Sequence, residues 1–197
     1  GVDSILKVVD QQMSTWNESS EISIFNKTKS TDPFKISDDF FYVLDNAKNI
    51  NFQTDGAFDY TVYPLASLWG FGPAQNGELS LPDSLEIKEV LTYTGTEHII
   101  LNYPFIKKTH PNVQLDLNAI AKGYCVDLLY NWLLKNEFDN IFVEIGGEIR
   151  SCGHNINGKL WKVGIDIPKD NSISGTNFFT TVLLNREALA TSGNYRN

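Results

Sequence analysis

One segment with a marked apolar face most constrains how this chain folds. Apolar residues recur every three or four positions from Ile120 to Trp132, which predicts an amphipathic helix that packs one face against a core. Residues 113–117 before it read as a short strand. Asn118 is a good N-cap candidate, so the free N–H groups of the first helical turn would lie beside Lys122. Such groups favour phosphate, and the junction therefore predicts a site for an anionic ligand.

The charge balance argues against one class of partner. Sixteen Lys and Arg against 24 Asp and Glu give a formal net charge of -8, whereas a protein that binds duplex nucleic acid needs a basic surface. We therefore expect no nucleic-acid partner. The 197 residues are 42% hydrophobic, which is enough for a substantial core, and they contain no apolar run long enough to span a membrane.

The two cysteines do not have the spacing of a redox or metal motif. Cys125 and Cys152 are far apart in the chain, and Cys125 lies on the apolar face of the expected helix. We interpret both as small buried hydrophobic residues rather than as a disulfide.

The rest of the chain mixes helical and strand patterns without repeats. Helices are expected at 4–16, 37–48, 64–69 and within 81–91, and strands at 98–102, 105–108, 140–145, 159–167 and 180–185. Residues 22–26 read as a short turn, 70–82 as a long loop and 189–197 as an exposed turn. The expected fold class is α+β, a single domain over 1–197 with helices on one side of a mainly antiparallel sheet.

Four further segments carry polar or aromatic groups, and each has two interpretations. Residues 54–73 combine small residues with Phe and Trp, which suits an aromatic ligand or a loop filled by core side chains. The glycine pair in 144–148 permits close approach of a ligand or forms a bulge. The hydroxyls of 190–195 bind phosphate or close a hairpin. Met and Trp in 13–16 usually pack at a helix end.

The order of these segments is more specific than any one of them. Together they resemble the ApbE family of FAD:protein FMN transferases over essentially the whole chain. The resemblance rests on Met-Ser-Thr-Trp at 13–16 with Ser-Ile-Phe-Asn at 23–26, Asp-Gly-Ala-Phe-Asp at 55–59, Leu-Trp-Gly-Phe-Gly-Pro at 68–73, Asp-Leu-Asn-Ala-Ile-Ala-Lys-Gly at 116–123, Ile-Gly-Gly at 145–147 and Ala-Thr-Ser-Gly-Asn-Tyr at 190–195.

The resemblance implies both a fold and an activity. The fold is an ApbE-like, T-fold-like arrangement of helices with antiparallel sheet. The activity is magnesium-dependent transfer of FMN from FAD to a threonine hydroxyl of a target protein, with release of AMP. Some members of the family instead hydrolyse FAD to FMN and AMP. A flavin-binding module without catalysis is the third alternative.

Several residues match positions with known roles in the family. By resemblance, Met13 packs against the flavin nucleotide, and Ala57, Phe58 and Asp59 line its pocket. Asp116 and Lys122 are similar to residues that contact FAD, and Lys122 would neutralise phosphate charge. Ala119 matches a position whose backbone carbonyl binds Mg²⁺.

The chain also departs from the family pattern. Tyr60 and Tyr63 stand where many relatives have Pro and Gly. Relatives continue into a His-Thr-Ile-Asp-Pro-x-Thr-Gly motif and then a metal-binding Asp and Thr, and none of His98, His110 and His154 has that motif around it. Either the sequence lacks its C-terminal part, which we favour, or it is a degenerate relative that binds flavin without transferring it. No catalytic residue is therefore assigned.

The family also implies a compartment. Its members act largely in the bacterial periplasm or at the outer face of the cytoplasmic membrane, often as lipoproteins. We therefore expect a leader, and a possible lipid anchor, before Gly1.

Overall fold

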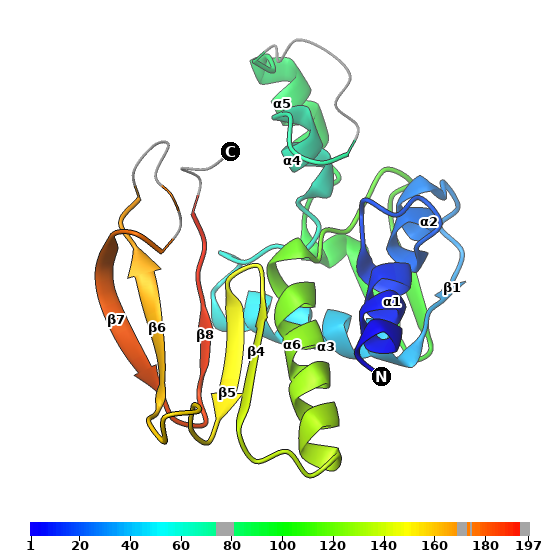
Figure 1. The fold of residues 1–197 in the computed structure, drawn as a ribbon. Helices are drawn as coiled ribbons and strands as arrows, with labels where there is room; N and C mark the ends of the chain where they lie inside the picture. The colour runs from blue at the N-terminus through cyan, green and yellow to red at the C-terminus, as the bar shows by residue number, and fades with distance from the viewer. Residues whose placement is uncertain (74–80, 169–172, 174, 194–197) are drawn as a thin grey trace. The chain divides into compact units, whose positions relative to one another are not determined.

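The computed structural model describes residues 1–73, 81–168, 173 and 175–193 (Figure 1). The chain divides into two compact units. The first contains Gly1 and Asp3–Ala121, and the second contains Val2 and Lys122–Asn197.

The first unit combines helices with a small antiparallel sheet. Its helices are α1 (Val2–Met13), α2 (Glu21–Lys27), α3 (Asp38–Gln53), α4 (Tyr63–Leu68), α5 (Ser84–Leu91) and the short 3₁₀ helix η1 (Thr96–His98). Its strands are β1 (Phe34–Lys35), β2 (Ile99–Asn102) and β3 (Phe105–Lys108), in the order β1-β3-β2. Leu101 pairs with Ile106 in the β2–β3 hairpin. The helices and hairpin expected here are confirmed, with shifts of a few residues at their ends.

Local sequence explains the two most regular helices of this unit. Helix α3 buries residues spaced three and four apart, which are Phe40, Val43, Leu44 and Ala47. Helix α5 begins with a capping box in which the Asp83 carboxylate accepts from the Glu86 backbone N–H and the Glu86 carboxylate accepts from that of Asp83. Helix α3 runs to Gln53, beyond the expected end at Lys48.

The prediction of a turn at residues 22–26 is wrong, because these residues form helix α2. Ser20 caps this helix by accepting a 3.1 Å bond from the Ser23 N–H. Ile22 and Phe25 are buried from its inner face. A seven-residue helix is too short to show a clear period in sequence, and burial of these side chains stabilises it.

The prediction of a strand at 113–117 is also wrong. This stretch belongs to no sheet, although Val113, Leu115 and Leu117 are fully buried. The Asn26 side chain replaces a neighbouring strand, since its amide donates to the Leu115 carbonyl at 2.9 Å and its oxygen accepts from the Leu115 N–H at 2.7 Å. The alternating apolar pattern at 113–117 therefore indicates burial of these side chains and not strand pairing.

The second unit consists of most of one long helix and two antiparallel sheets. Helix α6 (Asn118–Lys135) starts in the first unit and continues in the second from Lys122. Strands β4 (Ile141–Ile145), β5 (Glu148–Cys152) and β8 (Ala188–Ala190) form one sheet in the order β4-β5-β8. Strands β6 (Trp161–Asp166) and β7 (Phe178–Leu184) form a two-stranded sheet. Strand β5 is an element that the sequence pattern did not identify, and β8 includes the first two residues of the stretch expected to be an exposed turn.

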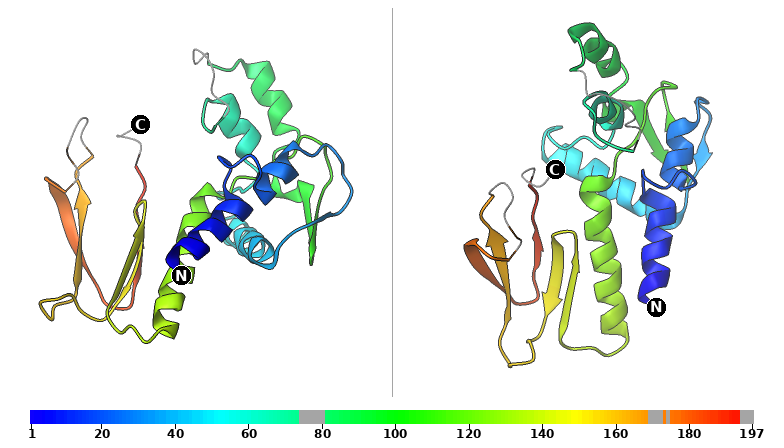
Figure 2. Two further views of the ribbon diagram at one scale, coloured as in Figure 1. Left: turned by 45° about the vertical axis from the view of Figure 1, so that its right-hand side comes forward. Right: turned by 45° about the horizontal axis from the view of Figure 1, so that its top comes forward.

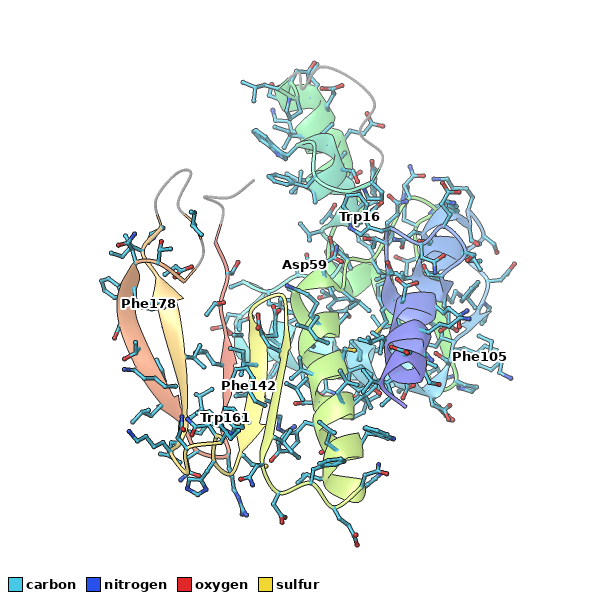
Figure 3. The ribbon with its side chains drawn as sticks, in the orientation of Figure 1. Trp16, Asp59, Phe105, Phe142, Trp161 and Phe178 are labelled. Atoms are coloured by element: carbon cyan, nitrogen blue, oxygen red, sulfur yellow. The ribbon has the colours of Figure 1, made fainter. Side chains whose placement is uncertain are left out.

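Polar and aromatic contacts connect the elements of this unit. Both views in Figure 2 show β4 and β5 alongside α6, and the Arg150 guanidinium on β5 binds the Asp127 carboxylate on α6 at 2.6 Å. Phe142 and Trp161, labelled in Figure 3, pack with ring centroids 5.2 Å apart. The Phe178 ring of β7 lies over Gly164 of β6, where any side chain would collide with it.

The start of α6 differs from the prediction that Asn118 is its N-cap. The Leu117 carbonyl already accepts from the N–H groups of Ile120 and Ala121, so Asn118 is the first helical residue. The Asp116 carboxylate accepts from the Asn118 N–H at 2.8 Å. The side chain that satisfies a free donor at this helix start is therefore an aspartate two residues earlier.

Two further predictions are confirmed. Cys125 and Cys152 are free and buried, as expected of small hydrophobic residues. The α+β fold class is confirmed, since every strand pairing is antiparallel and helices accompany the sheets. The strands of the described residues form three small sheets, however, and not one continuous sheet.

Candidate functional site

The end of α1 meets the start of α6 within the first unit. The Asn118 amide donates to the Thr15 hydroxyl at 3.4 Å, which joins the Met13–Trp16 segment to the Asp116–Ala121 segment across 103 positions of sequence. Met13 is 1% exposed, whereas Trp16, labelled in Figure 3, is 68% exposed. The thioether of Met13 thus belongs to the core beside this junction, and the indole of Trp16 faces solvent.

A turn stabilised by Asp59 follows the Gly-Ala-Phe segment. Its carboxylate accepts from the Thr61 N–H at 2.7 Å and from the Thr61 hydroxyl at 2.6 Å. The buried Thr61 hydroxyl in turn accepts from the Gly95 N–H at 2.7 Å. Ala57 is exposed, while Phe58 and Asp59 are half-buried. Asp59 is therefore oriented by a polar chain that runs into the body of the first unit.

One backbone hydrogen bond brings this turn beside the start of α6. The Asp116 N–H donates to the Tyr60 carbonyl at 2.8 Å. Tyr60 itself is buried, which together with the nearby Asp59 charge raises the pKa of its phenol to about 12. The departure from the family pattern at this position thus places a neutral aromatic ring in the core. Three sequence motifs, at 13–16, 55–59 and 116–121, converge in the first unit.

Asp116 is the carboxylate at the centre of this convergence. Burial raises its pKa above the ordinary value, and the hydrogen bonds from Asn118 oppose that shift. Ala119 follows in the first turn of α6, where it is exposed. The start of α6 therefore combines a partly buried carboxylate with an exposed small residue.

A second group of predicted residues gathers in the second unit. The Lys122 ammonium on α6 lies 3.0 Å from the Glu148 carboxylate on β5. The turn between β4 and β5 is made by Gly146 and Gly147, and Thr191 donates from both its N–H and its hydroxyl to the Gly147 carbonyl at 3.2 Å. The helix, the glycine pair and the threonine segment are thus neighbours. Asn194 and Tyr195 of that last motif lie outside the described residues.

Across 1–73, 81–168, 173 and 175–193, no three side chains of His, Cys, Asp or Glu gather closely enough to hold a metal ion. The magnesium position predicted from sequence uses the Ala119 backbone carbonyl and not a side chain.

Three positions in this arrangement were not predicted as site residues. Thr61 orients Asp59, Asn26 holds the strand-like stretch before Asp116, and Glu148 pairs with Lys122. The Asp-x-Thr spacing of 59–61 is a local signal that predicts such a turn. Asn26 and Glu148 contact residues far away in the sequence, so no local pattern predicts their roles.

Comparison with known proteins connects these motifs to a family. A sequence model described as the ApbE family matches residues 1–197. The chain belongs to the ApbE family. The family predicted from the order of the motifs is thereby confirmed.

Curated ApbE relatives are similar along the whole chain. The FAD:protein FMN transferase of Vibrio cholerae is 38% identical over 196 residues, which cover 100% of this chain and 58% of the relative. That of Haemophilus influenzae is 39% identical over 201 residues, covering 99% of this chain and 57% of the relative. The chain therefore spans less than two thirds of the length of the ApbE proteins that it matches.

Solved ApbE structures share the fold. The flavin transferase ApbE from Vibrio cholerae superposes with a TM-score of 0.89 at 37% identity, covering 99% of this chain and 62% of that one. The apo form of the flavinyl transferase ApbE from Pseudomonas stutzeri gives 0.87 at 32% identity, covering 100% and 60%.

Proposed function

We propose that this chain takes part in magnesium-dependent transfer of FMN from FAD to a threonine hydroxyl of a target protein. The observation that carries the proposal is the hydrogen bond from the Asp116 N–H to the Tyr60 carbonyl. It unites the Gly-Ala-Phe-Asp turn with the start of α6, the two segments expected to bind FAD. The names of the ApbE relatives, FAD:protein FMN transferase, support the same activity.

In this proposal, different residues bind different parts of FAD. Ala57, Phe58 and Asp59 supply small or flat surfaces for the flavin nucleotide, and the buried Met13 thioether supports that site from the core. Asp116 provides a polar group at the start of α6, and Lys122 provides a cation for phosphate. The chemistry is a displacement at phosphorus. The threonine oxygen bonds to the FMN phosphorus, the pyrophosphate bond breaks, AMP leaves, and the hydroxyl proton passes to a base.

We expect this chain to bind Mg²⁺ through only a few of its own oxygen atoms. Mg²⁺ in phosphate chemistry commonly keeps several waters and binds substrate phosphates with few protein ligands. The exposed Ala119 in the first turn of α6, with its carbonyl, suits such a role beside the phosphates. When bound, the ion would neutralise charge that develops on the phosphate oxygens.

We extend the proposal to the acceptor protein and to the compartment in which the reaction takes place. The acceptor is a flavoprotein with a threonine that reaches the FAD phosphorus. The compartment is the periplasm or the outer face of the cytoplasmic membrane, with a lipid anchor as the means of attachment. Within the described part of the chain, no helix has the length and apolar character needed to cross a membrane.

Mass spectrometry of the acceptor tests the proposal. The protein is incubated with FAD and Mg²⁺, with and without a threonine-containing acceptor domain, and an acceptor with Val in place of that Thr serves as the control. We expect the Thr acceptor alone to gain the mass of FMN, and chelation of the metal to stop the gain. Release of FMN and AMP without labelling would instead identify an FAD pyrophosphatase. Retention of intact FAD would identify a binding module.

A further inference from the structure

A carboxylate with little solvent exposure faces the lysine expected to bind phosphate. The Lys122 ammonium lies 3.0 Å from Glu148 Oε2, and the two side chains are 45% and 16% exposed. Glu148 is the first residue of β5 and pairs with Ile145 across the hairpin. The carboxylate is thus fixed on a strand, whereas the ammonium ends a long flexible side chain.

The glycine turn lets the lysine approach the hairpin. Gly146 and Gly147 adopt φ values of 56° and 97°, which residues other than glycine rarely adopt. A Cβ at Gly146 would lie 3.6 Å from both Cδ and Nζ of Lys122, so the lysine already runs in van der Waals range of the turn. A Cβ at Gly147 would lie 2.6 Å from the Thr191 hydroxyl, so that side of the turn is closed. Lys122 therefore occupies the open side of the turn.

We propose that Glu148 is a positioning residue for FAD binding, because its carboxylate holds the Lys122 ammonium at the Gly146–Gly147 turn. An ammonium has three N–H donors. Pairing with one carboxylate leaves donors for phosphate, and the Lys122 side chain is 45% exposed. Holding the lysine beforehand reduces the conformational entropy lost when the phosphate binds. The inference rests on the proposed function, in which Lys122 meets the FAD phosphates.

Positioning and competition predict opposite results. If Glu148 positions Lys122, its removal frees the lysine and weakens FAD binding. If Glu148 instead competes with phosphate for the ammonium, its removal tightens FAD binding. The sign of the change in FAD affinity therefore distinguishes the two.

The first measurement is FAD affinity by flavin fluorescence titration. Glu148→Ala should raise the Kd for FAD by about three- to thirtyfold, a change that lies within the range of coupling between contacting groups. Glu148→Gln, which keeps an oxygen acceptor in nearly the same volume, should raise it less. Glu144→Gln removes a carboxylate from the exposed face of β4 and should leave the Kd unchanged. In a Lys122→Ala background, Glu148→Ala should add no further loss.

The second measurement follows Lys122 without FAD. Reductive methylation, read by peptide mass spectrometry, should modify Lys122 faster in Glu148→Ala than in the unchanged protein. The exposed Lys162 provides the internal reference. Thermal unfolding verifies that the variants fold, and Glu148→Gln, close in shape to the native residue, carries the test if Glu148→Ala does not fold.

The outcomes separate the inference from the proposed function. An unchanged protein that binds no FAD contradicts the proposed function, while the methylation rates still report whether Glu148 holds Lys122. FAD binding that is equal or tighter in Glu148→Ala overturns the inference and leaves the proposed function standing. Equal methylation rates at Lys122 also overturn the inference.

Discussion

At the scale of single residues, Lys108 is a charged side chain in the core of the first unit. It is 1% exposed, and its ammonium donates to the carbonyls of Phe25 at 3.2 Å and Val113 at 3.1 Å. The ammonium also lies 4.8 Å from the centroid of the Phe25 ring. Burial, with a smaller contribution from the Lys29 charge, lowers the pKa of Lys108 to about 8. Lys108 therefore joins α2 to the stretch before Asp116 at an electrostatic cost.

This pKa predicts how stability depends on pH. Between pH 8 and 10 the folded Lys108 loses its proton while the unfolded lysine, with its ordinary pKa of 10.5, keeps it. The unfolded chain then binds more protons, so the Lys108 contribution to the free energy of unfolding rises with pH, by roughly 1 to 3 kcal/mol over this window. Urea unfolding at pH 7, 8, 9 and 10 measures the rise.

The matched variants are Lys108→Met and Lys107→Met. The second removes a neighbouring exposed lysine and should leave the pH dependence unchanged. The difference between native protein and Lys108→Met isolates the effect, because burial raises the pKa of Cys125 and so acts in the opposite sense above pH 9. Parallel stability curves for native protein and Lys108→Met would contradict the prediction.

At the scale of elements, the Asn26 side chain makes the hydrogen bonds to residues 113–117 that a neighbouring strand would otherwise make. Asn26 is buried and makes both backbone bonds with Leu115, and its own carbonyl accepts from the Gln114 side chain at 3.1 Å. We predict that Asn26→Ala lowers the free energy of unfolding by about 2 to 4 kcal/mol, since two buried backbone groups lose their partners. Amide hydrogen exchange at Leu115 and Asp116 should accelerate.

A second asparagine provides the control for this prediction. Asn46 is half-buried and donates to the Tyr42 carbonyl of its own helix in a solvent-exposed hydrogen bond, so Asn46→Ala should change the free energy of unfolding by less than about 0.5 kcal/mol. Equal losses for the two variants would show that the Asn26 bridge does not hold the segment.

Two glycines in the second unit should respond oppositely to alanine. At Gly147, φ is 97° and a Cβ would lie 2.6 Å from the Thr191 hydroxyl, so Gly147→Ala should destabilise the protein by about 1 to 3 kcal/mol. Gly123 lies within α6, where a Cβ would meet open space among the described residues outside its own helix. Gly123→Ala should stabilise by about 0.5 to 1 kcal/mol. Thermal unfolding of both variants checks the two signs, and a loss at Gly123 would mean that its surroundings are more crowded.

At the scale of the whole molecule, ligand binding should appear as thermal stabilisation. FAD at a hundred times its Kd should add about 2.7 kcal/mol to the free energy of unfolding. For a chain of this length that corresponds to a rise in Tm of roughly 5 to 10 °C. Riboflavin, which has no phosphate, should give a much smaller shift at the same concentration because it cannot use Lys122. Equal shifts from FAD and riboflavin would contradict a phosphate-centred site.

Sequence patterns located much of the fold and predicted the family. The apolar spacing of α6 and the order of the motifs depend on residues within one or two helical turns or on residue identity along the chain. The errors occurred where tertiary contacts override local preference. The α2 helix is stabilised by burial of Ile22 and Phe25, and the strand-like 113–117 pairs with one side chain.

The sequence by itself determined the helical faces, the free cysteines and the ApbE family membership, because each follows from short-range spacing or from motif order. Only the tertiary structure decided that Asp116 bonds to Tyr60, that Asn26 holds Leu115 and that Lys122 pairs with Glu148. These contacts join residues 26 or more positions apart. Their formation depends on how buried backbone groups find partners once the chain closes on itself, and no local pattern encodes that choice.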